Sequence, residues 1–103
     1  MLMPEGQEII TRLWEKAESI GAIKIGEMSP LSGAINQAFT FIGKPISGKK
    51  ATEDEALATA LILHIRGTKK PPLTEDQVIQ RLKVDRGRIQ LLVKNKHAQN
   101  IRF

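Results

Sequence analysis

The sequence predicts an all-α protein of about five helices, and three observations support this fold class. Apolar residues recur every three or four positions over most of the 103-residue chain, which is the period of a helix with one buried face. Helix-capping residues precede these apolar segments, and glycine or proline follows them. With 41% hydrophobic and 26% charged residues, the chain has the composition of a globular protein. Its length predicts a single domain, residues 1–103.

Two helices are expected in residues 4–43. The first has an apolar stripe over residues 9–20 and ends at Gly21, a residue type that commonly terminates helices. The second begins at residues 29–30, a serine cap followed by a first-turn proline, and ends at Gly43. This helical pair is a candidate dimerisation surface.

Two short segments lack a helical pattern. Residues 22–25, "AIKI", are expected as a connector or as a short strand, which would pair most naturally with residues 100–103. Residues 43–50, "GKPISGKK", share glycine and lysine positions with a phosphate-binding P-loop, but Lys50 stands where that loop has Ser or Thr and no strand precedes it. We therefore expect a flexible basic loop here.

A central helix is predicted to begin after Thr52. Thr52 and Glu55 have the spacing of a capping box, and residues 53–55 are all acidic, which favours the positive end of a helix dipole. Residues 56–65 are apolar nearly all round. This pattern is typical of a helix packed on several sides in the core.

The C-terminal part of the chain is expected to form two closely joined helices. Thr74 and Gln77 have the spacing of a second capping box, and Asp85 caps the helix 85–97. Because only three residues separate the two helices, they are expected to cross at a steep angle. With the preceding helix they make a trihelical core over residues 52–97.

Residues 74–94 read "TEDQVIQRLKVDRGRIQLLVK". The cap, core and turn residues of this segment are Thr74, Val78, Leu82, Val84, Asp85, Arg86, Ile89 and Leu92. This arrangement resembles the helix-turn-helix of bacterial and phage transcription regulators. Ile79 and Lys83 depart from that motif, which usually has alanine and glycine at these positions. Ile79 implies a wider helix crossing, and Lys83 implies a different turn conformation, because lysine disfavours positive φ.

The positive charge of the chain is concentrated at its C-terminal end. The net charge is +5, but residues 66–103 contain ten basic and three acidic residues, giving +7, whereas residues 1–43 carry −2. Such an asymmetry is expected of a protein that binds a polyanion.

The resemblance implies that the helix 85–97 enters the major groove of DNA. With its apolar residues turned inward, the candidates for base contacts are Arg86, Gly87 and Gln90. Arginine bonds guanine and glutamine bonds adenine bidentately, and glycine permits a close approach. The residues expected to contact the phosphate backbone are Lys69, Lys70, Thr74, Arg81, Lys83, Arg88 and Lys94.

These features predict a small, sequence-specific double-stranded DNA-binding protein, a transcriptional regulator of phage, plasmid or bacterial type. A homodimer is expected, because one helix-turn-helix covers only a half-site. Leu91 lies near the exposed side of the second helix and leaves an alternative open. In that alternative, the chain is an adaptor or inhibitor that binds an acidic partner protein through its basic C-terminal half.

Other classes of function have little support in the sequence. The chain has no cysteine and two histidines, and no nucleophile and base can be assembled, so we expect no enzyme, metal site or cofactor. The longest apolar stretch, residues 56–65, is far shorter than the roughly 20 residues that span a bilayer. Residues 1–4 lack the pattern of an export signal, so a cytoplasmic location without membrane contact is expected.

Overall fold

The computed structural model describes the backbone of residues 4–22 and 31–101, and the side chains of residues 6–22 and 31–95. Over these residues the chain forms five helices and one short antiparallel strand pair, which confirms the predicted all-α class. The helices are α1 (Pro4–Ser19), α2 (Ser32–Phe41), α3 (Glu53–Arg66), α4 (Glu75–Leu82) and α5 (Arg86–Ile101), and the strands are β1 (Pro45–Ile46) and β2 (Lys49–Lys50).

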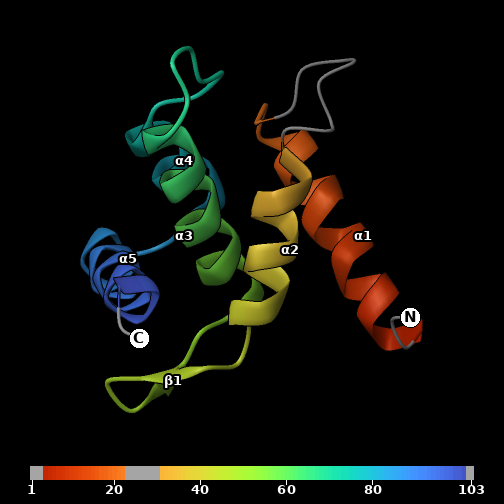
Figure 1. Cartoon of the computed structure of the whole chain (residues 1–103). Helices are drawn as coiled ribbons and strands as arrows, with labels where there is room; N and C mark the ends of the chain where they lie inside the picture. The colour runs from red at the N-terminus through yellow and green to blue at the C-terminus, as the bar shows by residue number, and fades with distance from the viewer. Residues whose placement is uncertain (1–3, 23–30, 102–103) are drawn as a thin grey trace.

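Helix α3 lies at the centre of the molecule (Figure 1). Helices α1 and α2 pack against each other and against α3, while α4 and α5 both pack on α3 as well. All seven residues from Ala56 to Ile62 are buried. The prediction that this helix is surrounded by the core is confirmed.

One hydrophobic core joins the N-terminal helices to the C-terminal ones. Its largest fully buried residues come from all five helices, α1 to α5, and the buried residues form one continuous cluster in the described part of the chain. These residues are Leu13, Ile35, Phe41, Leu57, Leu61, Ile62, Val78, Ile89 and Leu92.

Both predicted capping boxes are present. At α3, the Thr52 hydroxyl accepts a hydrogen bond from the Glu55 backbone N–H at 3.1 Å, and the Glu55 carboxylate accepts one from Thr52 N–H at 3.0 Å. Thr74 and Gln77 make the same two bonds at α4, at 3.1 and 3.0 Å. Each box supplies partners for backbone groups that a helix end leaves unpaired.

The acidic start of α3 is a junction for other elements. Each of its three carboxylates pairs with a cation from another helix, two from α1 and one from α5. The ion pairs are Arg12–Glu53, Lys16–Asp54 and Arg88–Glu55. The hydrogen bond between Arg12 and Glu53 lowers the pKa of Glu53 and raises the pKa of Arg12.

Residues 43–50 form a β-hairpin, so the expectation of a flexible loop is wrong. Ile46 pairs with Lys49 across a two-residue turn in which Ser47 and Gly48 both have positive φ, 55° and 80°. Positive φ at both central residues matches the twist of antiparallel strands. Ile46 is buried, so one side chain of the hairpin is anchored in the core.

The predicted strand pair of residues 22–25 with 100–103 is also wrong. Helix α5 continues to Ile101, so residues 100–101 are helical, while residues 23–25 and 102–103 lie outside the described part. The segment 98–101, "AQNI", contains neither glycine nor proline, so no local signal stops the helix at the predicted end, residue 97.

Candidate nucleic-acid interface

Helices α4 and α5 are joined by a tight turn at Lys83–Asp85. Lys83 adopts a left-handed conformation, φ 57° and ψ 43°, and its backbone N–H donates to the carbonyls of the last turn of α4. The Val84 N–H donates to Ile79 O at 3.2 Å. The expectation that Lys83 changes the turn conformation is therefore wrong: lysine takes the conformation that glycine would take, at a conformational cost of about 1–2 kcal/mol.

Asp85 starts α5 as predicted. Its carboxylate accepts a hydrogen bond from the Arg88 backbone N–H at 2.8 Å, and its carbonyl accepts one from the Ile89 N–H at 2.9 Å. A side-chain oxygen at this position satisfies an N–H that the first turn leaves unpaired. The first turn of α5 is therefore capped directly after the bend.

The inner faces of both helices are buried on α3. Val78 and Leu82 of α4 and Ile89, Leu92 and Val93 of α5 all belong to the core. Ile79, at the position where the motif usually has alanine, is 8% exposed and lines a groove between the helices. Leu91, expected near the exposed side of α5, is partly buried against the core. This packing accounts for an apolar residue at position 91.

The opposite face of α5 is open to solvent. Gly87, Gln90 and Lys94 are exposed, and the space beside Gly87 is empty within 4 Å apart from the Asp85 carboxylate. Arg86 is also exposed, at 50% of its side-chain area, and pairs with Asp76, which is more exposed still, at 2.7 Å. The three predicted base-contact residues are therefore all accessible at the start of α5, Gly87 on its open face and Arg86 and Gln90 at the edge next to α4.

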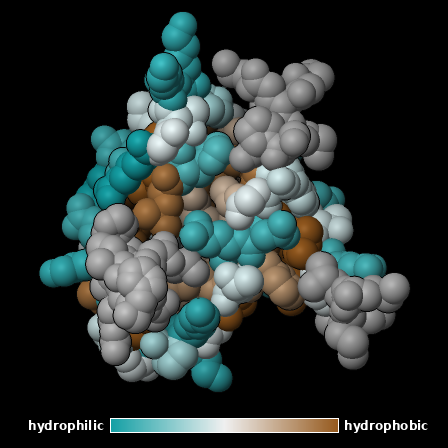
Figure 2. Space-filling model, viewed as in Figure 1, coloured by the Kyte–Doolittle hydropathy of each residue, from teal (hydrophilic) through white to brown (hydrophobic). Residues whose placement is uncertain are grey.

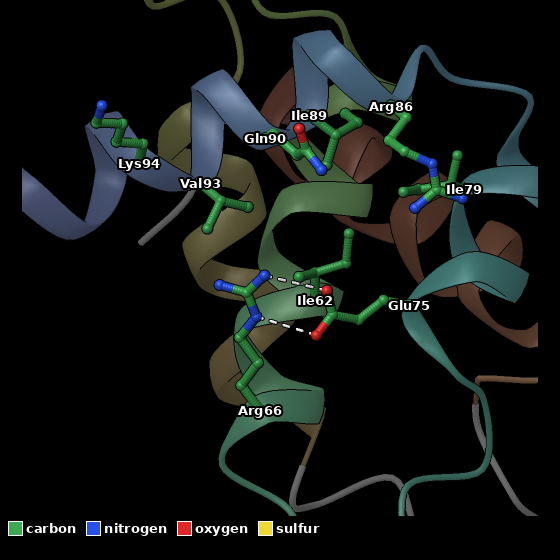
Figure 3. Close-up of a pocket in the computed structure, with 9 residues that line it drawn as sticks. All are labelled: Ile62, Arg66, Glu75, Ile79, Arg86, Ile89, Gln90, Val93 and Lys94. Carbon is green, nitrogen blue, oxygen red and sulfur yellow. Dashed lines mark hydrogen bonds and ion pairs between the residues drawn. The ribbon is translucent and has the colours of Figure 1, made fainter.

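A groove of about 260 Å³ runs along one flank of α5, between this helix, α3 and α4 (Figure 3). Its apolar side chains are Ile62, Ile79, Ile89 and Val93. The charged and polar side chains around them are Arg66, Glu75, Arg86, Gln90 and Lys94. Arg66 donates to both carboxylate oxygens of Glu75, at 3.0 and 3.1 Å, and this contact raises the pKa of Arg66.

Four of the predicted backbone-contact residues are exposed lysines. Lys69 and Lys70 lie in the connection between α3 and α4, Lys83 in the turn, and Lys94 on α5. Within the described residues, none of these four side chains forms a hydrogen bond or an ion pair. Their positive charge is therefore free of an internal counter-ion.

Two further predicted backbone-contact residues, Thr74 and Arg81, make hydrogen bonds that stabilise the fold. The Thr74 hydroxyl accepts the capping-box hydrogen bond from the Gln77 backbone N–H, which occupies one of its two acceptor positions. Arg81 Nη1 donates to Ile20 O at 2.8 Å and thereby ties α4 to the end of α1. Both residues are exposed, but part of each serves the fold.

Arg88 has a largely buried side chain, unlike the other residues predicted to contact the phosphate backbone. Its side chain is 9% exposed; Nη1 donates to Ile46 O at 2.7 Å and Nη2 to Lys49 O at 2.9 Å. Its Nε, buried without a hydrogen bond, lies 3.6 Å from Glu55 Oε2. The structure thus assigns Arg88 to the attachment of the hairpin, and the expectation that it contacts phosphate is corrected.

The hairpin of residues 45–50 adds exposed lysines beside α5, and this position was not predicted from the sequence. Lys44, Lys49 and Lys50 are exposed beside the attachment point of Arg88. The sequence signal is Ser47-Gly48 between two short segments, which is weaker than the Asn-Gly turn signal typical of such hairpins.

Nothing in the described residues indicates a metal site or a membrane span. No cluster of three or more His, Asp or Glu side chains is close enough to hold a metal ion in residues 6–22 and 31–95, and among the described helices none is long and apolar enough to cross a bilayer. No family model, curated protein or solved structure matches the chain.

Proposed function

We propose that this chain is a sequence-specific double-stranded DNA-binding protein that inserts α5 into the major groove. The observation that carries the proposal is the exposed start of α5, where Gly87 and Gln90 are exposed and Arg86 keeps 50% of its side-chain area open beside Asp76 of α4. A protruding helix with a buried inner face and a cationic outer face fits the width of the major groove. The activity is binding, with no catalysis, and its biological role is the regulation of transcription.

The Arg86–Asp76 ion pair is compatible with base contact. Both partners are largely exposed, and exposed pairs of this kind contribute at most about 1 kcal/mol. A bidentate arginine–guanine contact contributes about 1–3 kcal/mol of base discrimination. Exchange of the Asp76 carboxylate for a guanine edge is therefore favourable.

Lys69, Lys70, Lys83 and Lys94 supply the contacts to phosphate in this proposal. Lys94 lies on α5, Lys83 in the turn directly before it, and the other two in the connection between α3 and α4. None has an internal counter-ion in the described residues, and each neutralised phosphate releases condensed counter-ions. These contacts position the protein on DNA without reading its sequence.

The active species in this proposal is a homodimer, with the N-terminal helices as its interface. Ile9, Ile10 and Trp14 of α1 and Phe39 of α2 are only partly buried in the single chain. On the face shown in Figure 2, exposed hydrophobic areas are interrupted by hydrophilic ones. A second copy would cover apolar surface and place two copies of α5 on successive half-sites.

Selection of duplexes from a random pool, followed by binding at several salt concentrations, tests the proposal. Enrichment of one sequence and a log–log salt slope of about −4.5, for about five phosphates per protomer, are expected. Failure to enrich any sequence, or a duplex affinity that barely changes with salt, would overturn the proposal.

The groove beside α5 favours a second candidate, an adaptor for an acidic partner protein. Its apolar residues, bordered by Arg66, Arg86 and Lys94, suit an amphipathic acidic segment. This candidate predicts no enrichment of duplexes. It also predicts that Lys94→Glu, which reverses an exposed charge at the border of the groove, weakens partner binding more than Gln90→Ala does.

A further inference from the structure

The hairpin of residues 45–50 is fixed to α5 by one buried side chain. Arg88 leaves the first turn of α5 and donates to the carbonyls of Ile46 and Lys49, one on each strand. The same guanidinium is 3.6 Å from the Glu55 carboxylate of α3. Because charged hydrogen bonds in a poorly hydrated site are strong, the hairpin and the start of α5 are held as one unit.

The hairpin and the groove lie on different sides of α5. Successive helical residues are rotated by about 100°, so Arg88 is about 200° around the helix axis from both Arg86 and Gln90. Arg86 and Gln90 border the groove next to α4, whereas Arg88 faces the hairpin. The exposed face of α5 is therefore flanked by α4 on one side and by the hairpin on the other.

The hairpin carries positive charge and projects from the helical body beside α5 (Figure 1). Lys44, Lys49 and Lys50 are exposed, and no ion pair involves them within the described residues. Ile46 and Ala51 are buried and anchor the base of the hairpin. Ser47 and Gly48 of the turn are exposed as well.

We propose that this hairpin is a second contact to the DNA backbone, positioned by Arg88, on the side of the major groove opposite to α4. The inference rests on the proposed function, because it assumes that α5 occupies the groove. A major groove is bordered by two phosphate backbones about 12 Å apart. The lysines near α4 reach one backbone, and Lys49 and Lys50 reach the other.

The test is a double substitution, Lys49→Ala with Lys50→Ala, measured on the selected duplex and on unrelated duplexes. Both side chains are exposed, so the fold is expected to remain intact. Loss of two phosphate contacts lowers the salt slope by about 1.8 and weakens binding roughly 10- to 30-fold near 0.15 M salt. The loss is the same on every duplex, because phosphate contacts carry no sequence information.

A matched control lowers the net charge by the same amount elsewhere. Gln7→Glu on α1 with Asn36→Glu on α2 changes two exposed residues, on helices that lie across α3 from α5. Because these helices are also the proposed dimer interface, control and parent are compared at a protein concentration at which sedimentation shows the same oligomeric state for both. Its salt slope should stay within about 0.5 of the parent value. An equal loss in the control would show that net charge, and not the hairpin, is responsible, and would overturn the proposal.

The positioning role of Arg88 has a separate readout. Arg88→Met should weaken DNA binding to the same extent as the lysine pair, and the triple variant should be no weaker than either, because both changes remove the same contact. If the parent binds its duplex but the lysine variant keeps the parent salt slope, the hairpin proposal fails while the proposed function stands. If the parent binds no duplex, both fail.

Discussion

The two ends of α3 use charge in opposite ways. At the N-terminal end, three consecutive carboxylates are paired one by one with cations from α1 and α5. At the C-terminal end, Arg66 pairs with the nearby Glu75, and Lys69 and Lys70 follow without a partner in the described residues. The difference separates charges that assemble the fold from charges that remain open to another molecule.

Two arginines on α5 show the same difference between a charge that assembles the fold and a charge that remains open. Arg86 and Arg88 are two positions apart on α5, yet one is 50% exposed and the other 9% exposed. Arg86 has one solvent-exposed carboxylate as partner, while Arg88 contacts two carbonyls and a largely covered carboxylate. Residue type alone therefore does not decide whether a cation is available for DNA.

The largest expected effect is on stability, at Arg88. Arg88→Met removes the donors to Ile46 O and Lys49 O and leaves these carbonyls and Glu55 short of a partner, so we expect a loss of about 2–4 kcal/mol. Arg86→Met, which breaks only an exposed pair, should cost less than about 1 kcal/mol. Urea unfolding of both variants measures the difference. Equal losses would remove the distinction between the two arginines.

The next effect is on binding, at Arg86. Arg86→Ala should weaken binding to the selected duplex by about 1–3 kcal/mol and relax the preference at one base pair. Lys69→Ala should instead weaken all duplexes alike, because it removes a phosphate contact. Fluorescence anisotropy on the selected duplex and on single-base variants separates the two. Parent-like affinity of the Arg86 variant would exclude α5 as the reading helix.

A smaller effect is expected at Lys83, where an exposed charge carries a conformational cost. Lys83→Gly should stabilise the protein by about 1 kcal/mol, because glycine accepts φ 57° without the steric penalty. The same change should lower the DNA salt slope by about 0.9 if the lysine contacts one phosphate. Thermal unfolding and salt-dependent binding measure the two quantities. The matched control is Lys83→Asn, because asparagine removes the same charge and also tolerates this backbone conformation.

Local signals were sufficient to predict the helices and the starts of α3, α4 and α5, whereas the predicted start of the second helix at residues 29–30 lies outside the described residues. The spacing of Thr52 with Glu55 and of Thr74 with Gln77 identified two helix starts, and both capping boxes are present in the structure. The apolar pattern of residues 56–65 identified the central helix. These features depend on residues three or four positions apart, which a single sequence displays directly.

Contacts between residues far apart in the chain could not be predicted from the sequence. The hairpin is held by Arg88, 42 residues from Ile46, and neither residue signals the other. Arg88 has the residue type and helix position of a phosphate contact, and only the packed hairpin withdraws it from solvent. In the same way, the left-handed conformation of Lys83 follows from the packing of α4 and α5 on α3, which overrides the preference of lysine.

The smallest expected effect is a pH dependence at the acidic end of α3. The hydrogen bond from Arg12 lowers the pKa of Glu53 below its ordinary value of 4.5. A lowered folded-state pKa gives stability that is complete above the unfolded value and is lost as pH falls through the folded one. Glu53→Gln should therefore be slightly less stable than the parent from pH 7 to about 4.5, and this difference should shrink at lower pH.

Denaturant unfolding of parent and variant between pH 7 and 3 measures this difference. Glu15→Gln is the matched control, because Glu15 is exposed on α1 and forms no ion pair within the described residues. A Glu53 difference that persists unchanged to pH 3 would mean that the glutamine acts through packing and not through charge. The Arg12–Glu53 pair would then contribute as little to the assembly of the fold as the open charges at the other end of α3.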